Sequence, residues 1–213
     1  NDTLVMKENA LNSILGLVKN SLNEKPVLFF ANGAAKQQNK CTAFSSFEDF
    51  FKSASFNVTW IGAFGIWKED YEKIVDFEKA ASLQLIQVDI LFRMFESKKN
   101  SVIDNNAYFV VPPVEKKGGY DVIQVFADNY FKLLQAAIER GILSIKNYRI
   151  EQKQMLFNFF IPWFATAYSS PDKYFFEIKN WPRKLRKHYP FYIIILAQIS
   201  FMLKILLLVP EAK

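Results

Sequence analysis

Hydrophobic and polar residues follow different patterns in the two parts of this 213-residue chain. Up to residue 111, short apolar runs that indicate strands alternate with segments in which apolar residues recur every three to four positions, as on one face of a helix. Beyond residue 111 the helical spacing continues. We therefore predict an α/β first part with a mixed sheet, followed by an all-α extension.

The first part is predicted to contain several helices and short strands. Ala10, Ile14 and Val18 share one face of the first helix. Ser45-Ser46 precedes the second helix as a capping segment, because serine side chains accept hydrogen bonds from the first free amides of a helix. The predicted helices cover residues 7–23, 45 onward, 68–80 and 85–97, and the predicted strands cover 27–30 and 56–61. Residues 101–103 and 107–111 are predicted to form a strand pair or one irregular strand.

The second part is predicted to begin with a loop and a long helix over residues 121–139, which ends at Gly141. A basic cluster starts at Lys179, and a mostly apolar stretch follows from Pro190 to Val209. These changes in pattern divide the chain into residues 1–111, a helical extension over 112–178, and a basic and apolar tail over 179–213.

Composition limits the classes of function. Hydrophobic residues make up 51% of the chain, which is enough for a substantial core, and the net charge of +6 suits an anionic partner. Nucleic acid is not expected as that partner, because the basic residues are not interleaved with aromatic residues along a groove. The single Cys41 excludes an internal disulfide framework and a cysteine-rich zinc site.

The first candidate site is Asp2. The stretch Asp2-Thr3-Leu4-Val5 precedes the helical segment Ala10–Leu15 and the apolar run Val27–Phe30. This order of elements resembles the middle of a family 2 glycosyltransferase of the GT-A fold, in which a strand ends in an Asp-x-Asp motif and a helix and a further strand follow. The resemblance implies that Asp2 is the second acid of the motif and binds a divalent cation, Mg or Mn. The alternative is that Asp2 only belongs to a helix-capping region.

The resemblance to this family indicates two further candidate site residues, Trp60 and Asp89. In residues 57–74, Trp60 could stack on an acceptor sugar, or it could simply pack in the core. In residues 83–103, the resemblance implies that Asp89 is the general base that deprotonates the acceptor hydroxyl, although Gln87-Val88-Asp89 stands where the family has a Glu-Asp pair. The alternative is that Asp89 forms an ordinary ion pair with Arg93, one helical turn away. Asp70 ranks second as the base.

A glycine pair before the long helix is the next candidate. Gly118, Gly119, Tyr120 and Asp121 resemble a segment of polysaccharide-type members of the family, which implies contacts with the acceptor sugar. The alternative is a plain turn in which Asp121 caps the helix.

The tail carries the last candidates, four basic residues before the apolar stretch: Arg183, Lys184, Arg186 and Lys187. We predict that they contact a membrane surface, because lysine and arginine beside an apolar helix bind lipid phosphates. A transmembrane span and packing in a soluble core remain alternatives. Lys204 argues against the span, since a lysine at the centre of a span costs about 2.5–3.5 kcal/mol.

The resemblance covers roughly residues 1–140 and implies an inverting, metal-dependent glycosyltransferase. Such an enzyme moves a sugar from a nucleotide-sugar donor to a glycan or lipid-linked acceptor in bacterial surface-polysaccharide synthesis, at the cytoplasmic face of the inner membrane. The chain would then be a C-terminal fragment with an incomplete GT-A fold, without the N-terminal nucleotide-binding portion and inactive alone. The alternative function is a non-catalytic, membrane-associated helical interaction protein.

Overall fold

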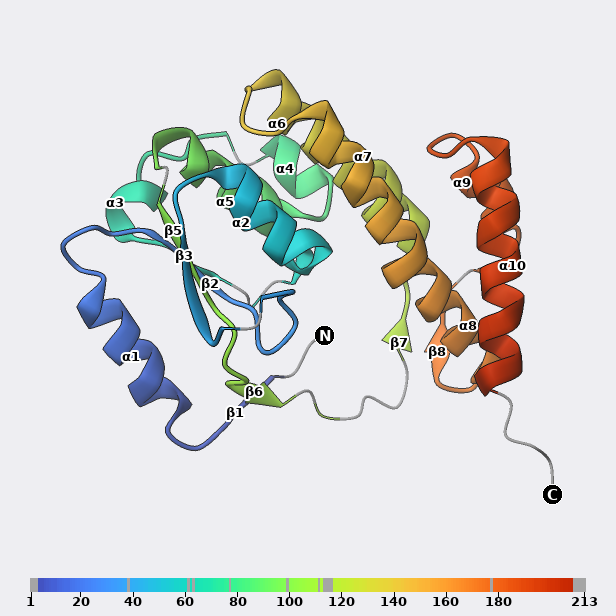
Figure 1. The fold of residues 1–213 in the computed structure, drawn as a ribbon, viewed down its shortest axis with the longest axis horizontal. Helices are drawn as coiled ribbons and strands as arrows, with labels where there is room; N and C mark the ends of the chain where they lie inside the picture. The colour runs from blue at the N-terminus through green and yellow to red at the C-terminus, as the bar shows by residue number, and fades with distance from the viewer. Residues whose placement is uncertain are drawn as a thin grey trace. The chain divides into compact units, whose positions relative to one another are not determined.

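The chain forms two compact units with a mixed α/β architecture (Figure 1). Unit 1 comprises Asn1–Pro113 and Ala136–Asn147, and unit 2 comprises Val114–Gln135 and Tyr148–Lys213. The first predicted boundary, at residue 111, lies near the first crossing between the units, whereas residue 179 lies inside unit 2. The computed structural model describes residues 4–37, 39–60, 62, 64–76, 78–98, 100–110, 112, 117–176 and 178–208.

Unit 1 is built on a four-stranded mixed sheet, with the strand order β3-β5-β2-β4. The central strands β2 and β5 run parallel, with Val27 opposite Ser101 and Phe30 opposite Asp104, and the outer strands are antiparallel to them. Its elements are β1 (Val5–Met6), α1 (Ala10–Asn20), β2 (Val27–Phe30), β3 (Cys41–Phe44), α2 (Phe47–Ala54), η1 (Ser55–Thr59), β4 (Phe64–Gly65), α3 (Lys68–Tyr71), α4 (Glu78–Ser82), α5 (Ile86–Ser97), β5 (Ser101–Asp104) and β6 (Phe109–Val110).

Helices cover both faces of this sheet, because every residue of β2 is buried and successive side chains point to opposite faces. Leu28 and Phe30 pack with Ala10 of α1. On the other face, the ring of Phe29 meets that of Phe50 in α2 edge to face, at a centroid distance of 5.5 Å. The phenylalanines of α2 and α5 fill this layer: Phe47, Phe50, Phe51, Phe92 and Phe95. The apolar run at 27–30 therefore forms a strand, as predicted.

Three sequence-based predictions in unit 1 are wrong. Residues 101–104 and 109–110 form separate strands that belong to different sheets, because β5 pairs with β2 and β3 whereas β6 pairs with β1. The expected strand at 56–61 is instead the 3-10 helix η1, where Asn57 Nδ2 donates to the Ala54 carbonyl and Thr59 Oγ1 donates to that of Phe56. Such local bonds compete with strand pairing. The expected single helix over 68–80 is divided into α3 and α4, and Asp76 between them has a positive φ of 63°.

Unit 2 is mainly helical, and its two chain segments are joined by a short parallel pairing of β7 with β8. Its elements are β7 (Lys117–Gly118), the π-helical segment η2 (Gln124–Asn129), α6 (Tyr130–Glu139), α7 (Ile145–Gln154), the π-helical segment η3 (Met155–Phe160), α8 (Ile161–Ser169), β8 (Tyr174–Phe175), α9 (Trp181–Leu185) and α10 (Phe191–Leu208). The predicted all-α extension is thus wrong in one detail, the β7–β8 pair. The helix predicted over 121–139 is confirmed, with a π-helical start and with Gly141 at its end at φ 74°.

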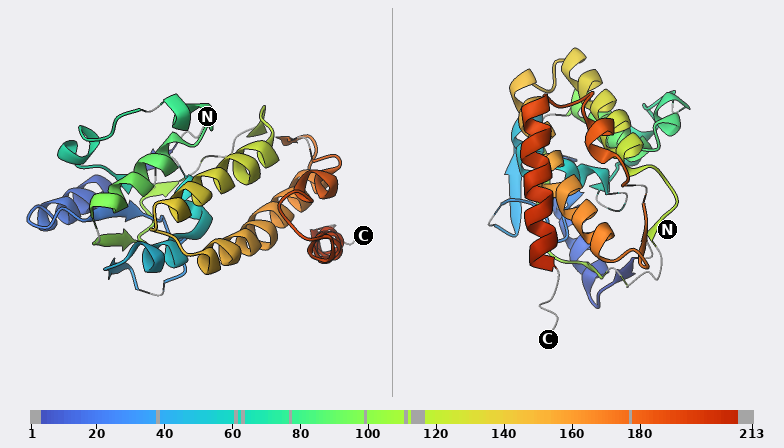
Figure 2. Two further views of the ribbon diagram at one scale, coloured as in Figure 1. Left: turned by 90° about the horizontal axis from the view of Figure 1, so that it is seen from above. Right: turned by 90° about the vertical axis from the view of Figure 1, so that its right-hand side faces the viewer.

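Helices α6 and α7 each contribute residues to both units, since unit 1 takes Ala136–Asn147 from them. Within unit 2, Tyr130 and Glu151 are both buried, and the tyrosine hydroxyl donates to Glu151 Oε1 at 3.1 Å. Helices α8 and α10 lie side by side in the views of Figures 1 and 2, and the ring of Tyr168 meets that of Phe201 at 6.0 Å. The core of unit 2 therefore includes one side of the apolar tail.

Candidate functional site

The carboxyl ends of the parallel strands β2 and β5 form one candidate site, which we call the carboxyl edge. Ligands of α/β sheets commonly bind where parallel strands end. Asn32 follows β2, and its amide exchanges two hydrogen bonds with the backbone of Phe109, at 2.9 and 3.1 Å. Asp104 ends β5 and is buried. The sequence analysis missed both residues, although a polar residue directly after an apolar strand is a signal that could have found them.

Asp104 lies in a closed hydrogen-bond network at the carboxyl edge. Its Oδ2 accepts from the hydroxyl of Tyr108 at 2.6 Å, and its Oδ1 accepts from the backbone amide of Asn106 at 2.9 Å. Burial, followed by the bond to Asp104, raises the pKa of Tyr108 to about 12. The tyrosine is therefore neutral and acts as a donor that holds the carboxylate in place.

Predicted acceptor residue Trp60 lies at the same edge. Its ring contacts that of Phe109 edge to face, at a centroid distance of 5.9 Å. Phe109 also pairs with Met6 of β1, and a Cβ at Gly62 would lie 2.9 Å from Leu4 Cδ1. Asp2, the predicted metal ligand, lies outside the described residues. The chain that follows it nevertheless runs beside Trp60 and Gly62.

Helix α5 is the third chain segment at the carboxyl edge, and it contributes Gln87. Its side-chain amide, on the first turn of α5, is buried and donates to the carbonyl of Thr59 at 2.8 Å. The sequence analysis did not single out Gln87, although it lies in the Gln87-Val88-Asp89 stretch that was compared with the Glu-Asp pair. A buried glutamine beside Trp60 can orient a hydroxyl group, but it has no proton to exchange near neutral pH.

Asp89, the predicted general base, points away from Thr59. Residues two positions apart on a helix differ by about 200° in direction, so Asp89 and Gln87 lie on opposite sides of α5. The Asp89 carboxylate is buried and lies 2.7 Å from Arg93 Nε and 3.3 Å from Arg140 Nη2. This is the geometry of the alternative interpretation, an ion pair with Arg93. Asp70, the second candidate base, is also buried and pairs with Lys98 at 2.6 Å.

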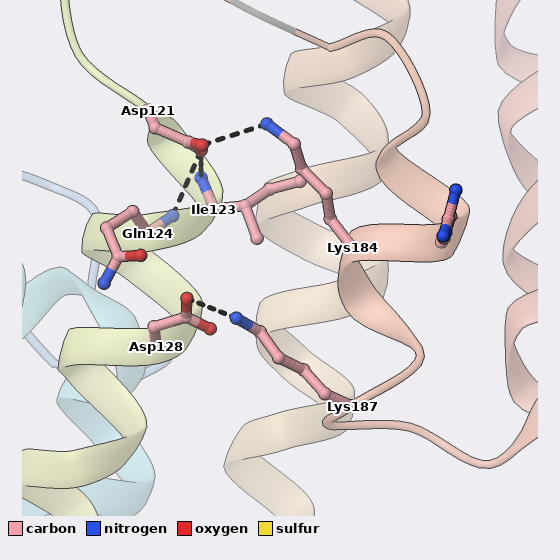
Figure 3. A pocket seen from close by; sticks show the side chains of 7 residues that line it. Asp121, Ile123, Gln124, Asp128, Lys184 and Lys187 are labelled. Carbon is pink, nitrogen blue, oxygen red and sulfur yellow. Dashed lines mark hydrogen bonds and ion pairs between the residues drawn. The ribbon is translucent and has the colours of Figure 1, made fainter.

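A second candidate site is an ion-paired cleft of about 430 Å³ within unit 2 (Figure 3). It lies between the start of the η2 helix and α9, and both acidic and basic side chains point into it. Its lining residues are Asp121, Ile123, Gln124, Asp128, Arg183, Lys184 and Lys187. Two segments that the sequence analysis treated separately, as acceptor-binding and membrane-contacting, therefore meet in one cleft.

Asp121 makes two kinds of interaction at the start of the η2 helix. Its Oδ1 accepts hydrogen bonds from the amides of Ile123 at 2.9 Å and Gln124 at 3.1 Å, which is helix capping. Its Oδ2 pairs with Lys184 Nζ at 2.9 Å. Burial alone would raise the pKa of Asp121, but the bonds from Lys184 and the two amides outweigh it and lower the pKa. The capping alternative is thus confirmed.

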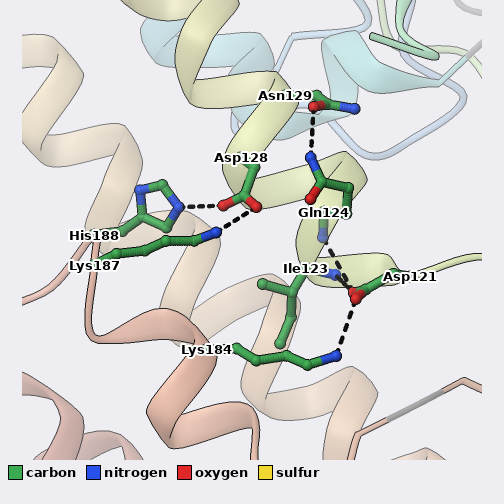
Figure 4. Close-up of polar contacts among 8 residues, drawn as sticks. All are labelled: Asp121, Ile123, Gln124, Asp128, Asn129, Lys184, Lys187 and His188. Carbon is green, nitrogen blue, oxygen red and sulfur yellow. Dashed lines mark hydrogen bonds and ion pairs between the residues drawn. The ribbon is translucent and has the colours of Figure 1, made fainter. Parts of the chain in front are cut away.

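Asp128 holds the other end of the cleft (Figure 4). Its two carboxylate oxygens lie 2.5 Å from Lys187 Nζ and from His188 Nε2. The same turn is π-helical, and the Gln124 side chain donates to Asn129 Oδ1, five residues further on, at 3.0 Å. π-Helical turns are rare and frequently occur at functional sites.

No known family, curated protein or solved structure matches this chain. Within the described residues, no group of three or more His, Cys, Asp or Glu side chains could hold a metal ion.

The predicted acceptor residues next to the cleft pack against the protein itself. A Cβ at Gly118 would lie 2.6 Å from the carbonyl oxygen of Phe175, and the φ of Gly118 is 151°. Gly119 has a φ of 91°, with open space around a Cβ position. Tyr120 contacts the ring of Phe176 at 5.4 Å. The glycine at 118 thus permits the approach of β8, a close contact between two backbones.

The four predicted membrane-contacting residues separate into two pairs. Lys184 and Lys187 form ion pairs with Asp121 and Asp128 inside the cleft. Arg183 and Arg186 are exposed, and no ion pair to either is found among the described residues. The guanidinium of Arg186 lies 5.2 Å from the ring centroid of Phe191.

Proposed function

We propose that unit 1 is the acceptor side of a GT-A-type glycosyltransferase, acting on a nucleotide-sugar donor and a glycan or lipid-linked acceptor. One observation carries this proposal. The segment that follows Asp2, the ring of Trp60, and the buried amide of Gln87 converge at the carboxyl edge of a mixed sheet. Sugar transfer requires a leaving-group site and an acceptor site next to each other.

In this proposal each residue has a separate role. An aromatic ring such as that of Trp60 gives a sugar an apolar face to pack on, and Gln87 orients an acceptor hydroxyl through its amide. Asp2 would hold a divalent cation, which neutralises the departing diphosphate. One carboxylate is a sufficient protein contribution for Mg²⁺, because magnesium is usually bound by one or two carboxylates together with substrate phosphates. Asp89 is not part of this arrangement, because its carboxylate pairs with Arg93 and Arg140 on the side of α5 opposite Gln87, out of reach of an acceptor hydroxyl there.

The proposal is tested by the paramagnetic effect of Mn²⁺, added together with a nucleoside diphosphate that supplies the phosphate ligands, on the tryptophan indole signals in NMR spectra of the chain. A cation at Asp2 is expected to broaden the Trp60 signal selectively. Trp67 is the internal reference, because its indole donates to the carbonyl of Pro26 at 2.8 Å, before β2 begins. Trp60 contacts Phe109, whose backbone bonds Asn32 after β2 ends. The four residues of β2 separate the two ends of the strand by roughly 13 Å.

Matched variants make the result specific. Asp2→Asn is expected to abolish the selective broadening of Trp60, and Glu8→Gln, which removes an exposed acid from the same segment, is expected to preserve it. Equal broadening of Trp60 and Trp67, or loss of the effect in Glu8→Gln, would contradict a metal site at Asp2 beside the acceptor side.

A second candidate function is a non-catalytic, membrane-associated interaction protein. It is favoured by one feature of unit 2, the exposure of apolar side chains along α10. The two functions are compatible, because a transferase with a lipid-linked acceptor works at a membrane. For that setting we propose the cytoplasmic face of a bacterial inner membrane.

A further inference from the structure

Helix α10 is apolar and largely uncovered. It has 18 residues with a mean hydropathy of 2.3, and 11% of them are buried. It is also the one helix among the described residues that is long and apolar enough to cross a membrane. Exposed apolar side chains extend along it: Phe191, Tyr192, Ile195, Leu196, Ile199, Met202, Leu203, Leu206, Leu207 and Leu208. An apolar surface of this kind marks a site of contact with a membrane or another protein.

One narrow stripe of α10 faces the protein. Ile194 and Ala197 are buried, and the Phe201 ring lies 5.7 Å from that of Trp181. At 3.6 residues per turn, Lys204 falls within about 80° of Ile194, on the same side as Ala197 and Phe201. It is only partly exposed. The lysine that argued against membrane insertion is thus turned toward the protein-facing stripe.

The opposite side of α10 carries no charge. Ile195, Leu196, Ile199, Leu203 and Leu206 project within about 100° of one another on a helical projection, and all are exposed. We call these five residues the outward face. Gln198 is exposed too, but it projects at the margin, nearer the stripe. The outward face can therefore meet hydrocarbon without burying a charged group.

Cations and aromatic rings lie at the start of this helix. Arg183 and Arg186 are exposed on α9 and the following turn, and Arg186 stacks on Phe191. Tyr192 is exposed next to it. Arginine binds phosphate, and tyrosine is enriched at the level of lipid headgroups. This combination selects an anionic phospholipid surface over an apolar protein partner.

We propose that α10 lies in the plane of an anionic bilayer surface, with its outward face among the acyl chains and with Arg183 and Arg186 at lipid phosphates. A transmembrane orientation would draw α8, which packs on the stripe, and the neighbouring charged groups toward the hydrocarbon. An in-plane helix leaves them outside, because such helices sink only about 5–10 Å into the headgroup and acyl boundary. This proposal does not depend on sugar transfer in unit 1.

The first test measures binding of the whole chain to vesicles of phosphatidylcholine with and without phosphatidylglycerol. Binding is expected to require phosphatidylglycerol and to weaken as salt rises. The variant Arg183→Gln/Arg186→Gln is expected to lower the partition coefficient about 30-fold at low salt, since each basic residue contributes about fivefold. Arg149→Gln/Lys153→Gln removes two exposed charges from α7 of the same unit and is expected to change binding less than about threefold.

The outward face is tested by Ile199→Gln/Leu203→Gln. This variant is expected to lower binding by at least about 30-fold at any salt concentration, because apolar burial is not screened. Its melting temperature is expected to stay unchanged, since both side chains are exposed in the free protein. Equal binding by this variant, equal effects of the two charge variants, or self-association through α10 without vesicle binding would each overturn the proposal.

Measuring the depth of labels in the bilayer distinguishes an α10 that lies in the membrane plane from one that spans the membrane. Nitroxide labels are attached through cysteines at Tyr192, Ile199 and Leu206, one at a time, in a Cys41→Ser background, because Cys41 is exposed. These positions project in nearly the same direction, and about 10 Å of helix separates each from the next. Equal, shallow depths at all three are expected for the in-plane helix. A maximum at Ile199 with shallower ends would show a span and overturn the proposal.

Discussion

Individual carboxylates in this chain are held by cations from distant segments. Asp121 and Lys184 are 63 residues apart, and Asp89 and Arg140 are 51 residues apart. Asp89 is buried, and because a buried charge without a partner is costly, its pair with Arg140 fixes the segments that carry the two residues. Asp121 is partly exposed, so its pair with Lys184 contributes less. The local partners of these acids, the capping amides and Arg93 one turn away, could be predicted from spacing. The distant partners could not, because nothing in the sequence indicates which turns become neighbours.

At Asp121 the cap and the ion pair can be separated by substitution. Asp121→Ala is expected to lower the free energy of unfolding by about 1 kcal/mol through loss of the cap alone, with a smaller addition from the ion pair. Asp121→Asn keeps a capping oxygen and is expected to lose only the smaller part. Urea unfolding of the two variants measures the difference, and equal losses would contradict the capping role.

The same residue predicts a dependence on pH. The folded pKa of Asp121 is lowered, so its stabilisation is complete above the unfolded value, about 3.9, and is lost as the pH falls through the folded value. The stability difference between the natural chain and Asp121→Asn should therefore be constant near neutrality and disappear in acid. A difference that persists below both pKa values would show that the charge of Asp121 is not its cause.

At the scale of elements, the stabilities of alanine variants at Gly118 and Gly119 test the close approach of β7 and β8. Gly118→Ala places a Cβ against the backbone of Phe175, whereas Gly119→Ala meets open space, and both positions have positive φ. Both variants are expected to lose about 1 kcal/mol or more from backbone strain, and Gly118→Ala to lose more because β8 must move. Thermal unfolding ranks the two, and faster amide hydrogen exchange at β8 in Gly118→Ala alone would identify the cause. Equal behaviour would contradict the close approach of β7 and β8.

Elements with a regular spacing of hydrophobic residues could be predicted from the sequence. Elements whose conformation depends on local side-chain hydrogen bonds could not. The run Val27–Phe30 and the helix over 85–97 follow from hydrophobic spacing alone. The η1 helix was mistaken for a strand because its residues are apolar enough for one, and the bonds of Asn57 and Thr59 decide otherwise. At the candidate site, Trp60 could be chosen from its residue type and Asp104 from its place at the end of an apolar run, but Gln87 becomes visible only when α5 packs beside Thr59.

For the whole molecule, the order of units along the chain has a consequence for stability. Residues 136–147 belong to unit 1 although unit 2 separates them from residue 113. They supply the buried Ala137 and Leu143, and Arg140, which pairs with Asp89. Residues 1–113 expressed alone are therefore expected to unfold at a lower temperature than the same residues with 136–147 attached through a short flexible linker. The longer chain with Arg140→Gln is expected to have a melting temperature between those of the other two chains. Equal melting temperatures of all three would contradict the assignment of residues 136–147 to unit 1.

The π-helical turn η2 makes this region tolerant of a change in chain length. A bond from residue i to residue i+5 encloses one more residue than the bond of an ordinary α-helix, so η2 is equivalent to an α-helical turn with one residue inserted. Deleting Val125, Phe126 or Ala127 would therefore restore an ordinary α-helical turn and leave Asp121 and Asp128 facing nearly the same directions as before. Both lysines of the cleft would then keep their carboxylates. In evolutionary terms, the loss of a single codon here would remove the π-helical turn and preserve the cleft.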